Sequence, residues 1–320
     1  MSVIAFLETE NGSFKKNASE VASYAHAVAQ KMGGTAVGIA FNATNAPEMG
    51  TYGIEKIVNV SDNGLESFNA QGYAHVIAEA VKKEESSIVV VGSSADAKYL
   101  APLLAAKLQA GYAPNVVAVP DDVSDFTVKR TAFSNKGFAF TKISTQTKVV
   151  GVSSNAFGAH ENQVDCQEEA FSPSIDTMGV SSVEIDKVTG KVSIADADIV
   201  VSGGRGLKGP ENWGMVEELA EVLGAATACS KPVSDMGWRP HSEHVGQTGK
   251  PVASNLYIAI GISGAIQHLA GVSASKTKVV INNDPEAPFF KAADYGIVGD
   301  AFEVVPKLIE KLREFKAQNS

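Results

Sequence analysis

The stretch Ile199-Val200-Val201-Ser202-Gly203-Gly204-Arg205-Gly206-Leu207-Lys208-Gly209 decides how this sequence is interpreted. Its first half is an apolar run of the kind that forms a buried strand of a parallel sheet. Its second half matches G-x-G-x-x-G from Gly204 to Gly209, and helix-forming residues follow from about Glu211 to Leu223. This order predicts an anion-binding turn, because glycines let the backbone approach a phosphate at a helix N-terminus. The alternative is a glycine-rich turn without a ligand.

A nicotinamide dinucleotide does not fit this turn. It would require an acidic residue at the end of the next strand, where the ribose binds. That strand is predicted at Ala225–Cys229, and it is followed by Ser230-Lys231, which has the wrong charge. The cations Arg205 and Lys208 nevertheless favour an anion in or near the turn.

Polar side chains follow several predicted strands of the C-terminal half. Further strands are predicted at Leu256–Ile262, Lys278–Asn282 and Tyr295–Val298, with helices at about 265–269 and 304–315. Ligands of open parallel sheets collect at the carboxyl ends of the strands. We therefore expect four strand-end side chains to converge on one site: Ser202, Ser230, Ser263 and Asn282. Asp300 is suited both to accept from a ribose hydroxyl and to cap the last helix.

Two more glycine-rich loops carry polar groups. In Gly246-Gln247-Thr248-Gly249-Lys250, Gln and Thr both donate and accept, which suits a flavin edge better than a bare phosphate; the alternative is a surface turn. The loop Gly261-Ile262-Ser263-Gly264-Ala265 nearly matches the hydrolase elbow G-x-S-x-G. The histidine after it, His268, lies in the same helix turn, which argues against a hydrolase. We expect instead an anion or ribityl contact at a helix N-terminus, with Ser263 as the cap. His268 is either a satisfied, partly buried histidine or a donor to a flavin carbonyl.

The first half alternates strand and helix patterns, which predicts βαβ units and a parallel sheet. Strands are expected at Val3–Glu8, Ala36–Phe41, Lys56–Val60 and Ser87–Gly92. Helices are expected from Asn17, as N-cap, to Gly33-Gly34, over about 64–83, and up to Gln109. Alternating stretches between Asp125 and Val152, with a turn at Asn135-Lys136-Gly137, predict an antiparallel extension of the sheet, and 155–178 is interpreted as a connecting segment.

The expected fold class is therefore α/β with two domains. Residues 1–190 form a nucleotide-binding-like parallel-sheet domain with an antiparallel extension, and residues 191–320 form a Rossmann-like domain. The length of 320 residues agrees with two domains, and 44% apolar residues suffice for two cores.

Composition limits the classes of partner and compartment. The net charge of -9 argues against nucleic acid. Cys166 and Cys229 suit a reducing compartment, and no His, Cys or carboxylate spacing indicates a metal. No apolar run approaches the roughly 20 residues of a membrane span, and the N-terminus lacks the features of a signal or transit peptide. We expect a soluble cytoplasmic protein.

The C-terminal half resembles the electron-transfer flavoprotein alpha subunit. The resemblance lies in Val200 to Gly209, Gly246 to Lys250, Leu256 to Gly271 and Asn282 to Asp300, and above all in Asn283-Asp284-Pro285-Glu286-Ala287-Pro288 with the later Ala293 to Val298. The N-terminal half matches more loosely, through its strand order and Val89 to Gly92.

This resemblance implies one FAD in the C-terminal domain, in an extended cleft that a smaller subunit also covers. It places the following residues around the FAD: Arg205, Ser230, Lys231, Val245, Gly246, Gln247, Thr248, Ser263, Gly264, Ala265, Ile266, Gln267, His268, Asn282 and Asp300. Thr248 matches a residue that bonds the flavin N5 region, and His268 one that faces the pyrimidine end. Lys231 departs from the family, which commonly has Arg there; Lys keeps the charge but loses the planar guanidinium.

The resemblance further implies an electron carrier without catalytic residues, active as a heterodimer with the small beta subunit. Its FAD would accept electrons from acyl-CoA dehydrogenases of fatty acid β-oxidation, or other flavin dehydrogenases, and pass them to a membrane quinone oxidoreductase. An electron-bifurcating, NADH-linked flavoprotein with a second FAD in the partner is the alternative. A nucleotide-binding sensor or interaction module built on the first domain is a third reading, but that domain has no phosphate motif, so a scaffold and partner interface fits it better.

Overall fold

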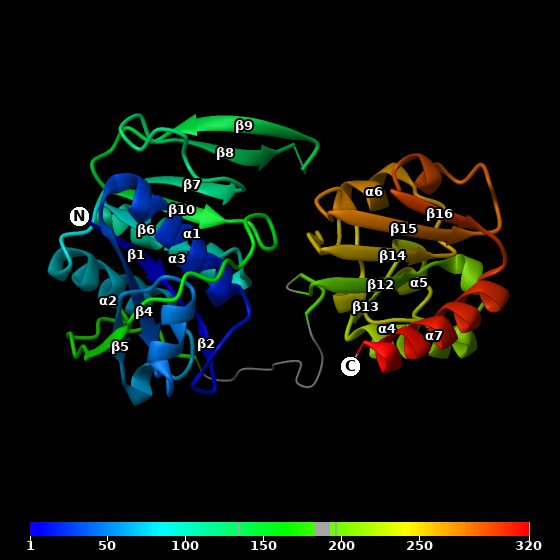
Figure 1. The fold of residues 1–320 in the computed structure, drawn as a ribbon, viewed down its shortest axis with the longest axis horizontal. Helices are drawn as coiled ribbons and strands as arrows, with labels where there is room; N and C mark the ends of the chain where they lie inside the picture. Colours follow the sequence, from blue (N-terminus) through cyan, green and yellow to red (C-terminus); the bar gives the residue numbers. More distant parts are fainter. Residues whose placement is uncertain (134, 183–192, 196, 320) are drawn as a thin grey trace. The chain divides into compact units, whose positions relative to one another are not determined.

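The computed structural model describes residues 1–133, 135–182, 193–195 and 197–319 (Figure 1). The strands and helices before residue 183 form one compact unit, and those after residue 192 form a second. Each unit combines helices with a parallel sheet, which confirms the expected mixed α/β class with two domains. The expected boundary at 190/191 lies outside the described residues. No described helix has the length and apolar character needed to cross a membrane.

The first unit is built on a large sheet that has nine strands among the described residues, in the order β11-β5-β4-β1-β6-β10-β7-β8-β9. The strands are β1 (Ser2–Phe6), β4 (Thr35–Phe41), β5 (Lys56–Val60), β6 (Ile88–Val91), β7 (Gly111–Val116), β8 (Thr127–Ala132), β9 (Gly137–Lys142), β10 (Lys148–Val152) and β11 (Gln167–Ala170). A small antiparallel pair, β2 (Thr9–Glu10) and β3 (Ser13–Phe14), follows β1. The strands from β11 to β7 pair in parallel, whereas β8 and β9 pair antiparallel, which confirms the antiparallel extension.

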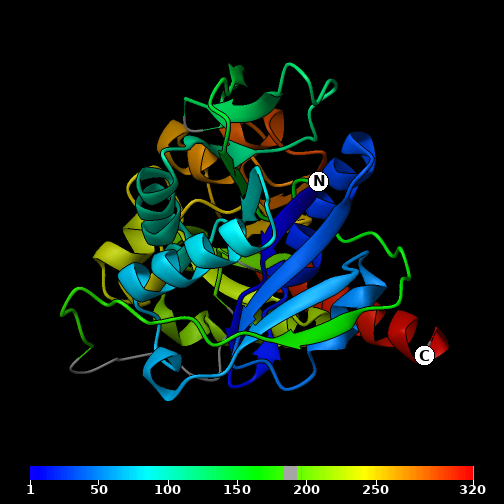
Figure 2. The ribbon, with the colours of Figure 1, turned by 90° about the vertical axis from the view of Figure 1, so that its left-hand side faces the viewer.

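Helices bury both faces of this sheet. They are α1 (Asn17–Met32), α2 (Ala70–Lys83) and α3 (Ala95–Leu108). Figure 2 shows this sheet with its helices as a ribbon. Alternate residues of β1 point to opposite faces, so Val3 and Ala5 pack with α1, while Ile4 and Phe6 pack with α2 and α3. Burial on both faces explains the continuous apolar character of the central strands.

Three expectations for this unit are wrong. The strand β10 does not belong to the antiparallel extension but pairs in parallel with β6 on one side and β7 on the other. Val149 and Val150 are buried on opposite faces of the sheet, as is usual for a strand in its interior. The connecting segment 155–178 contains β11, which extends the parallel sheet beside β5. Asn17 is the first residue of α1 rather than its cap, and its amide donates to Glu8 instead (2.9 Å).

The helix expected from residue 64 begins at Ala70. Asn69 caps it, because its side chain accepts from Gly72 N. The residues before it form a separate 3-10 turn at Asn63–Leu65, which Asp62 caps in the same way. Asn and Asp side chains bind local backbone donors, so the helix begins later in the chain than its apolar spacing indicated.

The second unit is an all-parallel sheet of five strands among the described residues, in the order β13-β12-β14-β15-β16. The strands are β12 (Ile199–Gly203), β13 (Ala226–Cys229), β14 (Leu256–Ile260), β15 (Thr277–Asn282) and β16 (Tyr295–Val298). Counted within the unit, this is the order 2-1-3-4-5 of doubly wound sheets. The chain leaves β12 toward β13 on one side and returns to β14 on the other, so a crevice is expected where these two strands end.

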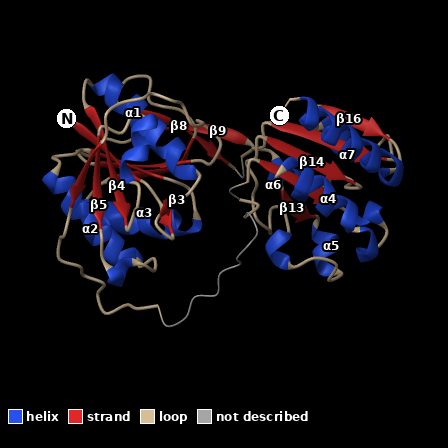
Figure 3. Cartoon of the chain, turned by 60° about the horizontal axis from the view of Figure 1, so that its bottom comes forward, coloured by secondary structure: helices blue, strands red, loops and turns tan. Residues whose placement is uncertain are grey.

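Helices and loops cover both faces of this sheet (Figure 3). The helices are α4 (Gly214–Leu223), α5 (Lys231–Asp235), α6 (Ile266–Val272) and α7 (Ala301–Gln318). Val201 and Ile258 pack with α4 and α7 on one face. Val200 and Tyr257 pack on the other face with Val245 and Phe289 from loops. Of these helices, α5 was not expected from the sequence.

Candidate cofactor site

A cavity of about 550 Å³ lies at the carboxyl ends of β12, β13, β14 and β15. Its volume is in the range of small-molecule and cofactor sites. Most of the residues that the sequence grouped around a cofactor line it: Arg205, Ser230, Lys231, Val245, Gly246, Gln247, Thr248, Ser263, Ala265, Gln267, His268 and Asn282. The carboxyl ends of the parallel strands lie at one edge of the sheet, and this brings together loops that are up to about 80 residues apart in the chain.

Four expected positions do not line the cavity. Ser202 lies inside β12 and is fully buried. Gly264 and Ile266 flank lining residues without joining them. Asp300 caps α7, because its Oδ1 accepts from Phe302 N (2.9 Å), and its Oδ2 lies 4.0 Å from Lys208 Nζ. The capping role expected for Asp300 is thus confirmed, and its contact with a ribose stays a prediction.

The first two glycines of the G-x-G-x-x-G stretch pack against another loop of the site. Gly206 N donates to Gly261 O (3.0 Å), and a Cβ on Gly206 would lie 2.7 Å from Gly261 Cα. These glycines therefore let the loops after β12 and β14 pack against each other. Two 3-10 turns, at Arg205–Leu207 and Pro210–Asn212, separate them from α4. The expected helix does follow the turn, but it begins at Gly214 rather than at about Glu211. Arg205 lines the cavity, and the binding of an anion by the turn stays a prediction.

Ser263 does not cap the helix that follows it. The N-cap of α6 is Ala265, without a side-chain hydrogen bond, and the carbonyl of Ser263 accepts from Phe289 N (3.1 Å). This contact ties the loop to the segment after β15. Ser263 and Asn282 both line the cavity, and the Asn282 amide donates to Ile262 O (3.1 Å).

The cavity carries two exposed cations. Arg205 lies after β12 and Lys231 opens α5. Within the described part of the chain, no hydrogen bond or ion pair involves either side chain head group, so both are available to an anionic ligand. Asp235 and Asp284 also line the cavity, which keeps its net charge low. Cations of this kind stabilise phosphates and electron-rich rings alike.

His268 is a buried neutral imidazole. Its side chain is 6% exposed, and its Nε2 lies 3.0 Å from the Tyr257 hydroxyl. Burial, and then neighbouring His244, lower the pKa of His268 from 6.5 to about 4, and the Val245 backbone opposes this shift. Its Nδ1 makes no hydrogen bond among the described residues. If the tyrosine donates to Nε2, the proton sits on Nδ1, and this neutral ring is a donor.

The sequence did not single out His244, which also lines the cavity. It is 1% exposed, and burial, followed by His241, lowers its pKa below the ordinary value. The preceding Glu243 binds Arg239 through two 2.8 Å hydrogen bonds, and Arg239 also contacts Glu217 of α4 (3.1 Å). The signal that could have found His244 is its place directly before the Val245–Thr248 loop, where it pairs with strand-end Cys229.

The lining suits a flavin dinucleotide. Gln247 and Thr248 offer mixed donors and acceptors of the kind that a flavin ring edge requires. Arg205 and Lys231 offer positive charge, and the buried His268 has an unbonded ring nitrogen. The cavity is also open along several strand ends, as an extended cofactor needs. Fold and cavity together define an α/β cofactor-binding protein.

Comparison with known proteins identifies the family. Residues 193–273 match the electron transfer flavoprotein FAD-binding domain, and residues 3–190 match the electron transfer flavoprotein domain. The chain is 39% identical to the electron transfer flavoprotein subunit alpha of Bacillus subtilis, with 84% of each chain covered. It is 35% identical to that of Thermoanaerobacterium thermosaccharolyticum (97% of each) and 35% identical to that of Paracoccus denitrificans (98% and 100%).

The chain therefore belongs to the electron transfer flavoprotein alpha subunit family. FAD is its cofactor, and the protein is an electron carrier rather than an enzyme in the ordinary sense. Alpha subunits of this family act with a beta subunit as a heterodimer. The resemblance seen in the sequence is confirmed.

Proposed function

We propose that this protein carries electrons from flavin dehydrogenases, of the acyl-CoA dehydrogenase type used in fatty acid β-oxidation, to a membrane quinone oxidoreductase. The observation that carries the proposal is the strand-end cavity, which gathers the two cations, the Gln247-Thr248 pair and a buried neutral histidine. None of these is arranged as a nucleophile with a base. Such a site holds a redox cofactor and tunes it, and the electron chemistry belongs to the cofactor.

We further propose that the FAD occupies this cavity in a Rossmann-like, doubly wound domain spanning residues 191–320. The residues expected from the resemblance would hold it, including Gly264, Ile266 and Asp300 at its edges. When bound, FAD supplies one- and two-electron redox chemistry at its ring. The chain's own residues orient the cofactor and set the charge around it.

Each group has a distinct part in this proposal. Lys231 and Arg205 provide positive charge that favours an electron-rich cofactor. Thr248 and Gln247 bind the polar edge of the ring, and His268 donates from its neutral imidazole. Because its pKa is about 4, His268 stays uncharged across the physiological range and acts as a hydrogen-bond donor rather than a point charge.

The first test is to co-express the chain with its small subunit and to record the visible spectrum. A yellow heterodimer with flavin that acyl-CoA dehydrogenase reduces is the expected result. A colourless heterodimer would contradict the cofactor site, and a flavin that quinone oxidoreductase cannot reoxidise would contradict the acceptor.

Counting flavins separates this function from the alternative electron-bifurcating, NADH-linked type. A carrier is expected to hold one FAD in this subunit, whereas a bifurcating flavoprotein would hold a second FAD in the partner and would oxidise NADH. Cys166 and Cys229 are both free thiols, which suits a reducing compartment, and on this ground we place the protein in the cytoplasm.

A further inference from the structure

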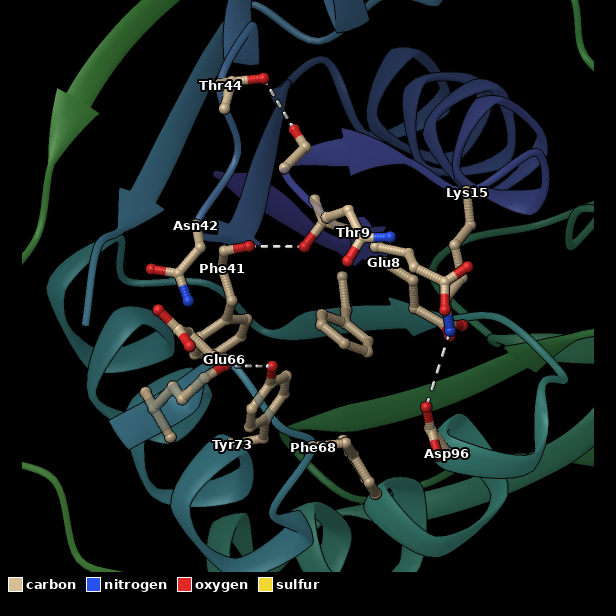
Figure 4. A pocket seen from close by; sticks show the side chains of 15 residues that line it. Glu8, Thr9, Lys15, Phe41, Asn42, Thr44, Glu66, Phe68, Tyr73 and Asp96 are labelled. Atoms are coloured by element: carbon tan, nitrogen blue, oxygen red, sulfur yellow. Dashed lines mark hydrogen bonds and ion pairs between the residues drawn. The ribbon is translucent and has the colours of Figure 1, made fainter. Parts of the chain in front are cut away.

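The first unit has a cavity of its own, of about 340 Å³. It lies at the carboxyl ends of β1 and β4, and Figure 4 shows the side chains that surround it. Three loops and the start of α3 supply its walls: the segment after β1, the segment after β4, and the turn before α2. This is the edge of a parallel sheet where ligands collect, and the carrier function proposed above does not use it.

The inner wall of this cavity is aromatic. Phe41 and Tyr73 stack with their ring centroids 3.9 Å apart, and Phe6 packs edge-on against both, at 6.0 and 6.1 Å. Phe68 lies edge-on to Tyr73 at 5.1 Å and is partly exposed, so its ring is available at the mouth. Aromatic faces attract positive charge through the quadrupole of the ring.

The hydroxyl groups around the cavity have already used their protons. Thr9 donates to Phe41 O, Thr44 donates to Gly12 O (3.1 Å), and Tyr73 donates to Leu65 O (2.9 Å). Each oxygen keeps lone pairs that can accept. These hydroxyl groups therefore serve as acceptors, and a ligand that binds them has to bring the protons.

Charge selects the ligand further. Four carboxylates line the cavity, those of Glu8, Glu10, Glu66 and Asp96, against one cation, Lys15. The Glu8 side chain is 4% exposed and lies 3.2 Å from Lys15 Nζ, which is also 3.6 Å from Asp96. Lys15 is thus shared between two carboxylates, as Figure 4 shows, and a phosphate would meet net negative charge.

The Glu66 carboxylate is a further hydrogen-bond acceptor on the wall of this cavity. Its carboxylate is exposed and makes no hydrogen bond or ion pair within the described part of the chain. It lies on the side of the cavity opposite the Glu8–Lys15 pair, next to Tyr73 (Figure 4). An ammonium group there would meet a carboxylate and an aromatic ring together.

We propose that this cavity binds a small organic cation with a primary ammonium group. The ammonium donates to the Glu66 carboxylate and the hydroxyl oxygens, and the hydrocarbon part lies against the aromatic wall. A second ammonium group is accommodated toward Asp96, which makes a short aliphatic diamine a suitable probe.

The test is calorimetric titration of putrescine into the FAD-loaded heterodimer at low ionic strength. We expect one site per alpha subunit. The double variant Glu66→Gln/Asp96→Asn should bind at least tenfold more weakly, because it removes two charges at the ammonium positions. The matched control Glu55→Gln/Glu161→Gln removes two exposed charges outside the cavity and should stay within about twofold. Phe68→Leu keeps an apolar side chain without a ring and should weaken binding about threefold.

Several results would overturn the proposal. One is the absence of binding at millimolar putrescine. Equal weakening in the double variant and its control would show attraction to the acidic surface alone. Adenosine or AMP binding in place of putrescine, weakened by Phe68→Leu, would show a nucleoside site. Far-ultraviolet circular dichroism of each variant checks that the heterodimer keeps its secondary structure. Phe68→Leu tests the aromatic wall without removing a charge.

Discussion

His268 should make the FAD-binding unit less stable as the pH falls below neutral. Its pKa is lowered from 6.5 to about 4, first by burial and then by His244. The unfolded chain therefore takes up a proton below pH 6.5 that the folded unit refuses until about pH 4. The contribution is fully present above pH 6.5 and is lost as the pH drops through this window. Its full size is about 3 kcal/mol, of which about 2 kcal/mol falls between pH 7 and pH 5.

The chain is well suited to this measurement. Both of its tryptophans, Trp213 and Trp238, lie in the second unit, so their fluorescence follows that unit alone during urea unfolding. The free energy of unfolding of the apo chain is measured at pH 7, 6 and 5 for the wild type and for His268→Gln, which cannot titrate but can still accept from Tyr257.

The difference between the two proteins isolates His268, because other titrating groups contribute to both. The wild type should lose about 2 kcal/mol more than the variant between pH 7 and pH 5. The exposed His241 of the same unit is the matched control, and His241→Gln should follow the wild type. If the wild type and His268→Gln lose stability in parallel, the histidine is not held neutral by burial, and the reasoning about its role as a neutral donor is refuted.

Three further predictions concern the frame and charge of the cofactor site. Glu243→Gln should lower the free energy of unfolding of the second unit by about 2 kcal/mol, because Arg239 loses the carboxylate that it binds through two hydrogen bonds. The control Glu218→Gln removes a carboxylate from an exposed pair with Arg313 and should cost less than about 1 kcal/mol. Equal urea midpoints for the two variants would contradict this prediction. Gly206→Ala should cost about 2 kcal/mol, because its Cβ would meet the Gly261 backbone at 2.7 Å, while Gly214→Ala, with open space around its Cβ, should be neutral or stabilising in the same unfolding assay. Lys231→Gln should lower the two-electron flavin potential by about 30 mV in a potentiometric titration, because it removes a positive charge from the cavity. Lys231→Arg keeps the charge and should leave the potential unchanged. An unchanged potential in Lys231→Gln would place Lys231 away from the ring.

The sequence determined the element types and the family. The apolar run Ile88–Val91 was found almost to the residue, because a strand buried on both faces is apolar throughout. The bounds of Tyr295–Val298 were also found, although this strand is exposed. The strand-end rule found most of the cavity lining, because parallel strands place their carboxyl ends at one edge whatever their order in the sheet. The motifs of the C-terminal half, above all Asn283 to Pro288 with Ala293 to Val298, indicated the family, and the comparisons confirm it.

Only the tertiary structure decided what each of these groups does. The glycines from Gly204 to Gly206 have a local pattern that resembles a phosphate turn, but their actual neighbour is Gly261, which lies 55 or more positions later in the chain. His244 and His268 are buried, and their pKa values are lowered, through contacts that the spacing in the sequence does not encode. The second cavity is assembled from three loops of the first unit, none of which carries a motif. Local sequence sets backbone preference and burial, whereas partners distant in the chain set charge state, and these contacts exist only in the folded protein.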